Sequence, residues 1–240
     1  ATTPGWDKGG VDVIAFADEE GHFGSFLGSY SFTGELEEAQ IDEAVDRTHG
    51  KPLRTALAEA GLADKPRLAL DKSRYVGFLE AHIEQGDWLE SEKLSIGIVT
   101  SIVSICQFRI VIEGTQNHAG TTRMAIRRDA GKAAAELCCA IDRAFAKHAG
   151  PRTVWTVGRI TLEPGAPSII PGRAEVLFQY RDADPARIEA LERVLEDVVA
   201  EANAASPCDM SLVALRKSIP AVMDEKFQAA LEAAAEGLKC

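Results

Sequence analysis

The hydrophobic pattern of residues 104–217 constrains the fold more than any other feature of the chain. Residues 107–113 alternate between apolar and polar side chains, which is the pattern of a half-buried strand. Residues 129–147 place apolar side chains about 3.6 residues apart, which predicts an amphipathic helix with Asp129 at its N-cap. The rest of the segment predicts four further elements: strands at 153–161 and 174–181, a helix that begins at Asp184 and Pro185, and a strand at 210–215. The order strand, helix, strand, strand, helix, strand is that of a split βαβ, ferredoxin-like module.

The segments on either side of this module predict a second unit. Residues 11–16 form a short apolar, β-branched run that predicts a buried strand, and residues 224–236 predict one more helix. Insertions are tolerated where chain ends lie close together on a surface. We therefore expect an α/β domain made of residues 1–103 and 218–240, interrupted by an α+β module at 104–217.

Composition excludes several classes of function. The 240 residues carry 26 basic and 37 acidic side chains, a net charge of −11, and such a field repels the phosphates of nucleic acid. No run approaches the roughly 18 apolar residues that a membrane-spanning helix needs, and the N-terminus lacks the basic-then-apolar layout of a signal peptide. The five cysteines are an odd number without CxxC spacing, which favours reduced thiols and a cytoplasmic location.

Three acidic residues, Asp18, Glu19 and Glu20, stand in a row directly after the predicted strand at 11–16. In an open α/β sheet, ligands usually bind at this end of the strands. Three adjacent carboxylates repel one another, and a divalent cation would offset the repulsion, with one side chain as a ligand and its neighbour acting on a water molecule. The alternative is a solvated acidic loop, which this segment alone favours.

A second candidate lies in the segment 80–86, EAHIEQG. His82 shares a face with Glu84 if the segment is extended, and Glu80 and Glu84 flank the imidazole. A carboxylate beside a metal-bound imidazole orients the ring and raises its basicity. A metal ligand and a core histidine are equally good interpretations of this segment.

Two further positions could bind an anionic group. Asn117 and His118 lie in a polar, glycine-bounded loop after the first strand of the module, where the imidazole could donate a hydrogen bond to a developing oxyanion. Arg181 lies on the polar face of its strand and could hold a substrate carboxylate in a bidentate fork. The alternatives are a surface histidine and a surface ion pair of Arg181 with Asp182 or Asp184. For Arg181 alone, the ion pair is preferred.

Five segments of the chain together resemble one enzyme family. They are DEEG (18–21), EAHIEQG (80–86), SIGIVTSIV (95–103), NHAGTTRM (117–124) and IIPGRAEVLFQYRD (169–182). This set is similar to the hydantoinase/carbamoylase branch of the M20 metallopeptidase family, which includes N-carbamoyl-L-amino-acid hydrolases, β-ureidopropionases and allantoate amidohydrolases. The resemblance covers almost the whole chain, and HIEQG followed by NHAGTT is its most specific part.

The resemblance implies an α/β domain with two Zn²⁺ ions that carries an inserted, ferredoxin-like lid and dimerisation domain. Glu19 matches the general base, and Glu20 and His82 match metal ligands; Mn²⁺ or Co²⁺ would suit the same ligands. The resemblance also implies a homodimer through the lid domain, in which His118 of one subunit acts in the active site of the other. The remaining matches are substrate-binding positions: Gln85, Asn117 and Arg181.

The expected activity is metal-dependent hydrolysis of the C–N bond of an N-carbamoyl amino acid or a related ureido acid, a small molecule with a carboxylate. The family also has an HxD pair before the acidic turn and a late GHDA-like segment. Neither occurs in this sequence, which therefore resembles the middle of a longer enzyme. Ser168 and Arg123 stand where the family usually has asparagine and proline. Two alternatives stay open: a non-catalytic, dimerising module with an incomplete metal site, and an M20 peptidase or aminoacylase.

Overall fold

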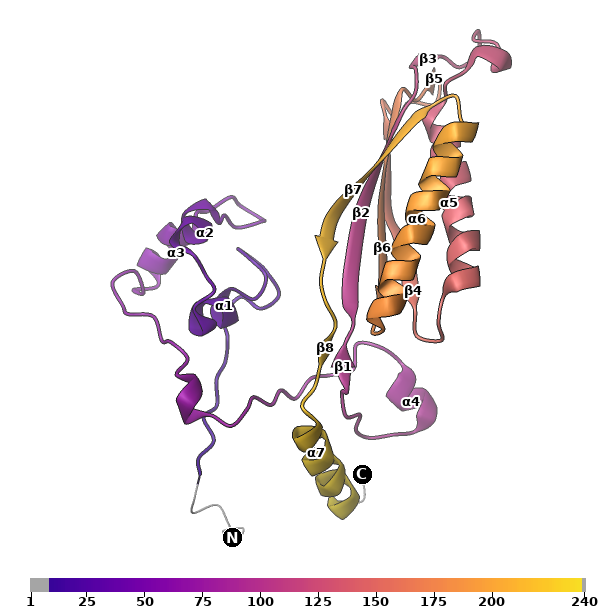
Figure 1. Ribbon diagram of the computed structural model, residues 1–240. Coiled ribbons are helices and arrows are strands. Elements are labelled where there is room, and N and C mark those ends of the chain that lie inside the picture. The colour runs from indigo at the N-terminus through magenta and orange to yellow at the C-terminus, as the bar shows by residue number, and fades with distance from the viewer. Residues whose placement is uncertain (1–8, 239–240) are drawn as a thin grey trace. The chain divides into compact units, whose positions relative to one another are not determined.

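The computed structural model describes residues 9–238 and divides the chain into two units (Figure 1). The N-terminal unit is Ala1–Ile83 and the C-terminal unit is Glu84–Cys240. Each unit is described by itself below.

A four-stranded antiparallel sheet forms the centre of the C-terminal unit, in the order β4-β6-β2-β7. The strands are β2 (Ser104–Glu113), β4 (Val154–Glu163), β6 (Arg173–Asp182) and β7 (Asp209–Lys217). Helices α5 (Ala130–His148) and α6 (Pro185–Ala205) lie side by side on one face of this sheet (Figure 1). This order of elements and strands confirms the predicted split βαβ arrangement.

The alternation of side chains in β2 and β6 follows from the burial of one face of each strand. Every second residue of β2 is buried, and the same is true of β6. The inward side chains meet the apolar faces of α5 and α6, where Phe145 packs edge-on against Phe178 with ring centroids 5.0 Å apart. The opposite, polar face of the sheet is not covered by these helices (Figure 1).

Both long helices begin where the sequence predicts. The carboxylate of Asp129 accepts the backbone N–H of Lys132 at 3.0 Å, and that of Asp184 accepts the N–H of Ala186 at 2.9 Å. Each bond satisfies a backbone donor that the first turn of a helix leaves unpaired. Pro185 occupies the first position of α6, where no N–H is needed.

Two short ladders, two α-helices and a 3₁₀ turn complete the C-terminal unit. At one end of the central sheet, β1 (Ser101–Ile102) pairs with β8 (Ala221–Val222), so the segments that enter and leave the sheet module run side by side. At the other end, β3 (Asn117–His118) pairs with β5 (Ile169–Ile170). The helices are α4 (Trp88–Glu92), α7 (Glu225–Leu238) and the short 3₁₀ turn η3 (Met124–Ile126). Helix α7 confirms the prediction for 224–236.

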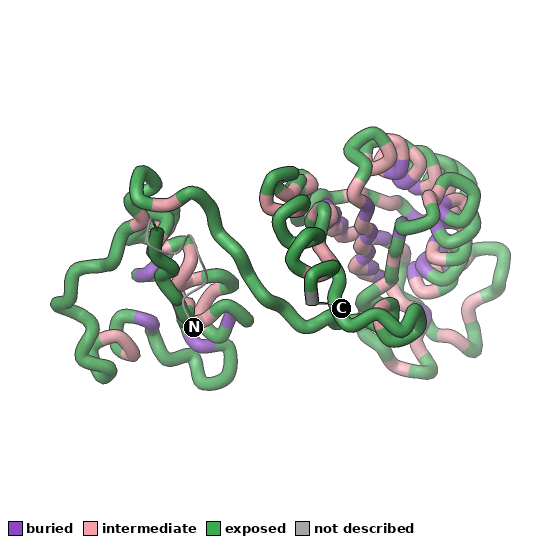
Figure 2. Tube along the Cα trace, turned by 90° about the horizontal axis from the view of Figure 1, so that it is seen from below, coloured by how far each residue is buried: buried purple, intermediate pink, exposed green. Residues whose placement is uncertain are grey.

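The N-terminal unit has short helices and few buried side chains. Its elements are α1 (Leu27–Thr33), α2 (Glu38–Glu43), α3 (Leu53–Glu59) and the 3₁₀ turn η2 (Lys72–Arg74). Among its described residues, only Ile41, Asp46 and Leu53 have buried side chains. Figure 2 shows the contrast, since buried residues are concentrated in the C-terminal unit.

The predicted buried strand at 11–16 was wrong. These residues have no regular secondary structure, and Val11 and Val13 are 68% and 93% exposed. A strand persists only when neighbours complete its backbone hydrogen bonds. In the described part of the N-terminal unit, no named strand is present to pair with this segment.

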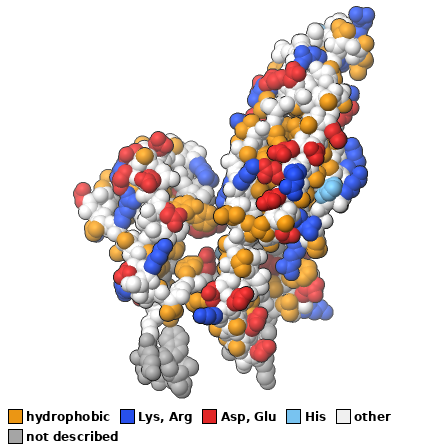
Figure 3. All heavy atoms as spheres, viewed as in Figure 1, with side chains coloured by type: hydrophobic (Ala, Val, Ile, Leu, Met, Phe, Trp, Pro, Cys, Tyr) orange, Lys and Arg blue, Asp and Glu red, His pale blue; other side chains and the backbone are white. Residues whose placement is uncertain are grey.

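The surface carries charges of both signs. Acidic and basic side chains are interspersed over the face seen in Figure 3, with apolar atoms between them. In residues 9–238, no helix combines the length and apolar character that crossing a membrane requires.

Candidate active site

The three carboxylates of the acidic turn differ in their contacts. Asp18 has a left-handed backbone conformation (φ 57°), and its carboxylate accepts the N–H groups of His22, Phe23 and Gly24, the last two at 2.8 and 3.0 Å. Partial burial works to raise the pKa of Asp18, but the three backbone donors outweigh it and lower the pKa. The side chains of Glu19 and Glu20 are exposed and bind no described residue. Asp18 is therefore structural, while Glu19 and Glu20 are free for chemistry.

A buried carboxylate anchors the end of this turn. Asp46 lies 3.2 Å from Nε2 of His22 and 3.1 Å from Nδ1 of His49, and it accepts the N–H of Thr48 at 2.6 Å. The Thr48 N–H is the main reason that the pKa of Asp46 is lowered, against the effect of burial. Both histidine rings are exposed. The contact of His22 with Asp46 connects the acidic turn to a distant part of the same unit.

His82 is exposed in an extended segment, and its tautomer follows from one contact. Its Nδ1 lies 2.5 Å from the carbonyl oxygen of Ile83. A carbonyl only accepts, so Nδ1 carries the hydrogen and Nε2 keeps a lone pair, the state that a metal ligand requires. The Glu84 carboxylate accepts the N–H groups of Trp88 and Leu89 at 3.1 and 2.8 Å. Glu84 therefore holds the start of α4.

The described residues do not form a complete metal centre. Among residues 9–238, no three His, Cys, Asp or Glu side chains come together in a group that could hold a metal ion. The donor types of Glu20 and His82 nevertheless suit zinc, and the tautomer of His82 leaves the lone pair of Nε2 available. Gln85, the neighbouring substrate-binding candidate, is exposed.

The loop that begins at β3 holds His118 in the opposite tautomer. Its Nδ1 accepts the backbone N–H groups of Gly120 at 3.0 Å and Thr121 at 3.2 Å. Since Nδ1 is the acceptor, the hydrogen of the neutral ring lies on Nε2. The side-chain oxygen of Asn117 accepts the backbone N–H of His118 at 2.9 Å, so this oxygen is used within the loop. The exposed His118 therefore presents an N–H donor.

One arginine that the sequence did not single out fastens this loop. Arg127 donates from Nη2 to the carbonyl oxygen of Ala119 at 2.6 Å and from Nε to that of Thr122 at 3.1 Å. Thr122 Oγ1 in turn donates to the carbonyl oxygen of His118 at 2.7 Å. The Arg127 guanidinium thus restrains the backbone at Ala119 and Thr122, which follow His118 in the loop.

Arg181 is half-buried near the end of β6 and has no carboxylate partner among the described residues. The preferred surface ion pair of Arg181 with Asp182 or Asp184 was wrong, because both carboxylates bind other groups near them. The Asp182 carboxylate accepts the Thr153 hydroxyl and, at 2.8 Å, the N–H of Asp184, while the Asp184 carboxylate caps α6. The positive charge of Arg181 is available to an anion.

The structure places His118 and Arg181 at opposite ends of the central sheet. His118 pairs with Ile169, which lies four residues before Arg173, the first residue of β6. Arg181 follows Arg173 by eight residues, which corresponds to about 26 Å of extended strand. Figure 1 shows β3 and β5 at one end of the sheet and β1 and β8 beyond the other. A small substrate cannot touch both side chains of one copy.

Comparisons with known proteins show which family the chain resembles. The peptidase dimerisation domain of the M20 type matches residues 100–207. The crystal structure of an amidase of the hydantoinase/carbamoylase family from Burkholderia phymatum matches 93% of this chain and 55% of its own, with 46% identity and a TM-score of 0.85. The chain belongs to the hydantoinase/carbamoylase branch of the M20 family.

Named relatives of this family member have related activities. It is 37% identical over 198 residues to the ureidoglycolate hydrolase of Arabidopsis thaliana, which covers 79% of this chain and 42% of the relative. It is 34% identical over 206 residues to the N-carbamoyl-L-amino-acid amidohydrolase of Paenarthrobacter aurescens, and this match covers 82% of this chain and 50% of the relative. The chain therefore spans about half the length of the curated relatives that it matches.

Proposed function

We propose that this protein is a metal-dependent amidohydrolase that cleaves the C–N bond of an N-carbamoyl amino acid or a related ureido acid. The observation that carries the proposal is the pair of donor groups on the C-terminal unit that remain available to an anionic ligand. The Nε2–H of His118 is set as a donor by two backbone N–H groups, and Arg181 is a cation with no described counter-ion. The relatives named above act on such ureido compounds and support the choice of substrate class.

Enzymes of this family generally depend on a metal ion. We assign Glu20 and His82 as ligands of Zn²⁺, with Mn²⁺ or Co²⁺ as alternatives, because carboxylate and imidazole donors suit all three. A bound metal supplies polarisation of the scissile carbonyl and acidification of a water molecule.

The residues of this chain carry the remaining steps. Glu19 takes the proton of the attacking water and passes it to the leaving nitrogen. His118 donates its Nε2–H to the oxyanion that develops on the carbonyl oxygen. Arg181 binds the carboxylate of the substrate and fixes the position of the scissile bond, with Gln85 and Asn117 as further substrate contacts. For an N-carbamoyl amino acid, the products are the amino acid, ammonia and carbon dioxide.

The distance between His118 and Arg181 supports a homodimer. Because one copy cannot bring both side chains to one small substrate, two copies must each contribute one of them. We assign the dimer contact to a lid domain at 104–217 and the catalytic domain to 1–103 and 218–240. A cytoplasmic location is consistent with four described cysteines that form no disulfide.

A substrate panel and metal analysis test the proposed function in the protein as its gene encodes it. We expect hydrolysis of N-carbamoyl amino acids or ureidoglycolate, and about two metal ions per chain. Preferential cleavage of N-acyl amino acids or dipeptides would replace the proposal by an aminoacylase or peptidase. No turnover together with almost no bound metal would identify a non-catalytic module.

Substitution of the general base tests the mechanism. Glu19→Gln keeps the shape of the side chain but cannot take a proton, so turnover should fall by about three orders of magnitude or more while bound metal is retained. Glu35→Gln is a matched control, since Glu35 is also an exposed carboxylate of the N-terminal unit. Wild-type turnover in Glu19→Gln would remove Glu19 from its role.

A further inference from the structure

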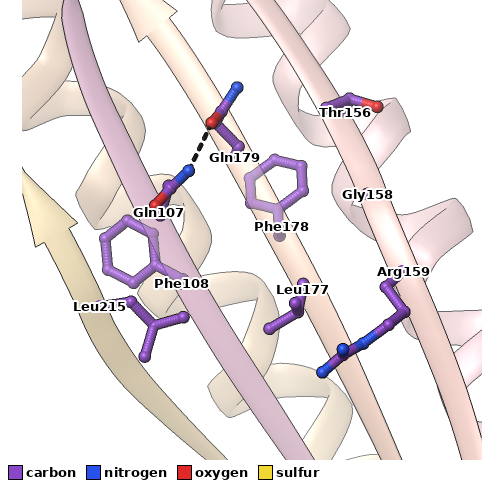
Figure 4. A pocket seen from close by; sticks show the side chains of 9 residues that line it. All are labelled: Gln107, Phe108, Thr156, Gly158, Arg159, Leu177, Phe178, Gln179 and Leu215. Carbon is purple, nitrogen blue, oxygen red and sulfur yellow. Dashed lines mark hydrogen bonds between the residues drawn. The ribbon is translucent and has the colours of Figure 1, made fainter. Parts of the chain in front are cut away.

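The polar face of the central sheet carries a short chain of amides that leads to Arg181. Gln107 on β2 and Gln179 on β6 lie directly opposite each other in the strand register, and their side-chain amides are 2.7 Å apart (Figure 4). Both line a hollow of about 400 Å³ on this face, together with Thr156, Leu177 and other side chains. Gln179 precedes Arg181 by two residues, so the two side chains share the polar face.

The contacts of Arg181 decide how the Gln179 amide is oriented. With its oxygen turned toward Arg181, that oxygen accepts hydrogen bonds from both Nε and Nη2 at 3.0 Å. Its nitrogen then lies 2.7 Å from the Gln107 amide, which must turn its own oxygen toward Gln179 to accept the hydrogen bond, because two NH₂ groups cannot bond to each other. In the reverse orientation, the Gln179 NH₂ group would face the guanidinium N–H groups, donor against donor. The first orientation satisfies the guanidinium, so Gln179 is an acceptor for Arg181.

This contact uses one particular edge of the guanidinium. Nε and Nη2 form the side edge of the group, and the end edge formed by Nη1 and Nη2 has no partner among the described residues. A carboxylate can bind an arginine through two parallel N–H groups on either edge. Gln179 therefore occupies the side edge and leaves the end edge for a ligand.

We propose that Gln179, held in turn by Gln107, is a positioning residue that fixes Arg181 for end-on binding of the substrate carboxylate. This inference rests on the proposed function, because it assumes that Arg181 binds the carboxylate. Arginine has several rotatable bonds, and ordering them on binding costs free energy. A guanidinium that is already held in place avoids much of this cost and presents a defined edge.

Kinetics in the full protein with N-carbamoyl-L-alanine and its carboxamide test the role of Gln179. Gln179→Leu removes the acceptor but keeps a side chain of similar size, so KM for the carboxylate compound should rise about tenfold with little change in kcat. KM for the uncharged carboxamide should stay within about twofold of the wild-type value. Gln179→Glu retains an acceptor oxygen and should recover most of the lost affinity.

Two comparison variants separate this inference from the proposed function. Arg181→Met should raise KM for the carboxylate compound about a hundredfold, and Gln107→Leu should have a smaller effect than Gln179→Leu. An unchanged KM in Gln179→Leu beside a raised KM in Arg181→Met would overturn the positioning role alone. An unchanged KM in Arg181→Met, or no turnover by the wild type, would overturn the proposed function and this inference with it.

Discussion

The two ends of the central sheet hold their candidate site residues, His118 and Arg181, by different means. At the β3 end, backbone N–H groups and a second arginine hold the His118 loop. At the other end, Arg181 projects from a regular strand and is contacted by a side-chain amide of the same strand. The loop fixes the tautomer of His118. The strand places Gln179 against one edge of the Arg181 guanidinium and leaves the other edge open. Their separation also shows that one copy of the sheet cannot deliver both groups to one substrate.

The largest effect on this comparison is expected from the imidazole. His118→Phe keeps a flat ring but removes the Nε2–H donor, so kcat should fall about 100- to 1,000-fold with bound metal unchanged. His148→Phe is the control, because His148 is an exposed residue at the end of α5. If kcat of His118→Phe equals that of the control, the β3 end has no part in catalysis.

A smaller effect is expected from the residue that fastens the loop. Arg127→Met removes the bonds to the carbonyl oxygens of Ala119 and Thr122, so the loop should sample other conformations and kcat should fall about tenfold. Exposed Arg143 on α5 provides the control variant Arg143→Met. Measurement of kcat and of the melting temperature of both variants separates a loop effect from loss of the fold, and equal kcat values would contradict the role of Arg127.

The smallest effect is expected from Glu175, which forms an ion pair with Arg159 on the central sheet between its two ends. The pKa of Glu175 is held below its usual 4.5, chiefly by the hydrogen bond from Arg159, against the effect of burial. A lowered pKa in the folded state stabilises the protein above the usual value, and this contribution is lost as the pH falls through the folded-state pKa. The Tm of the wild type should therefore fall more steeply below pH 4.5 than that of Glu175→Gln. Parallel Tm curves for the two proteins would contradict this expectation.

The sequence predicted the C-terminal unit well because its core repeats with the period of each element. The alternation in β2 and the N-caps Asp129 and Asp184 are local signals, and the structure confirms them. The strand at 11–16 could not be predicted from its own residues, because a strand depends on a neighbour that the segment does not contain.

The candidate site was only partly readable from the sequence. Motifs drew attention to His82, His118 and Arg181, and the structure adds their tautomers and free edges. The residues that restrain them, Arg127 and Gln179, belong to no motif, and their partners are defined only by the folded loop and strand. The spacing of Gln179 and Arg181 on one face was the single signal available. The proposed roles of all the site residues remain predictions: Glu19, Glu20, His82, Gln85, Asn117, His118 and Arg181.

Complementation between two variants with low kcat/KM tests most directly whether the two ends of the sheet serve the active sites of different copies. His118→Phe and Arg181→Met subunits, each with its own affinity tag, are produced together and the mixed dimer is purified. If one copy supplies the imidazole and the other the guanidinium, one of the two sites is intact and kcat/KM per dimer should be about half the wild-type value. A mixed dimer no more active than the better of the two single variants would contradict the account.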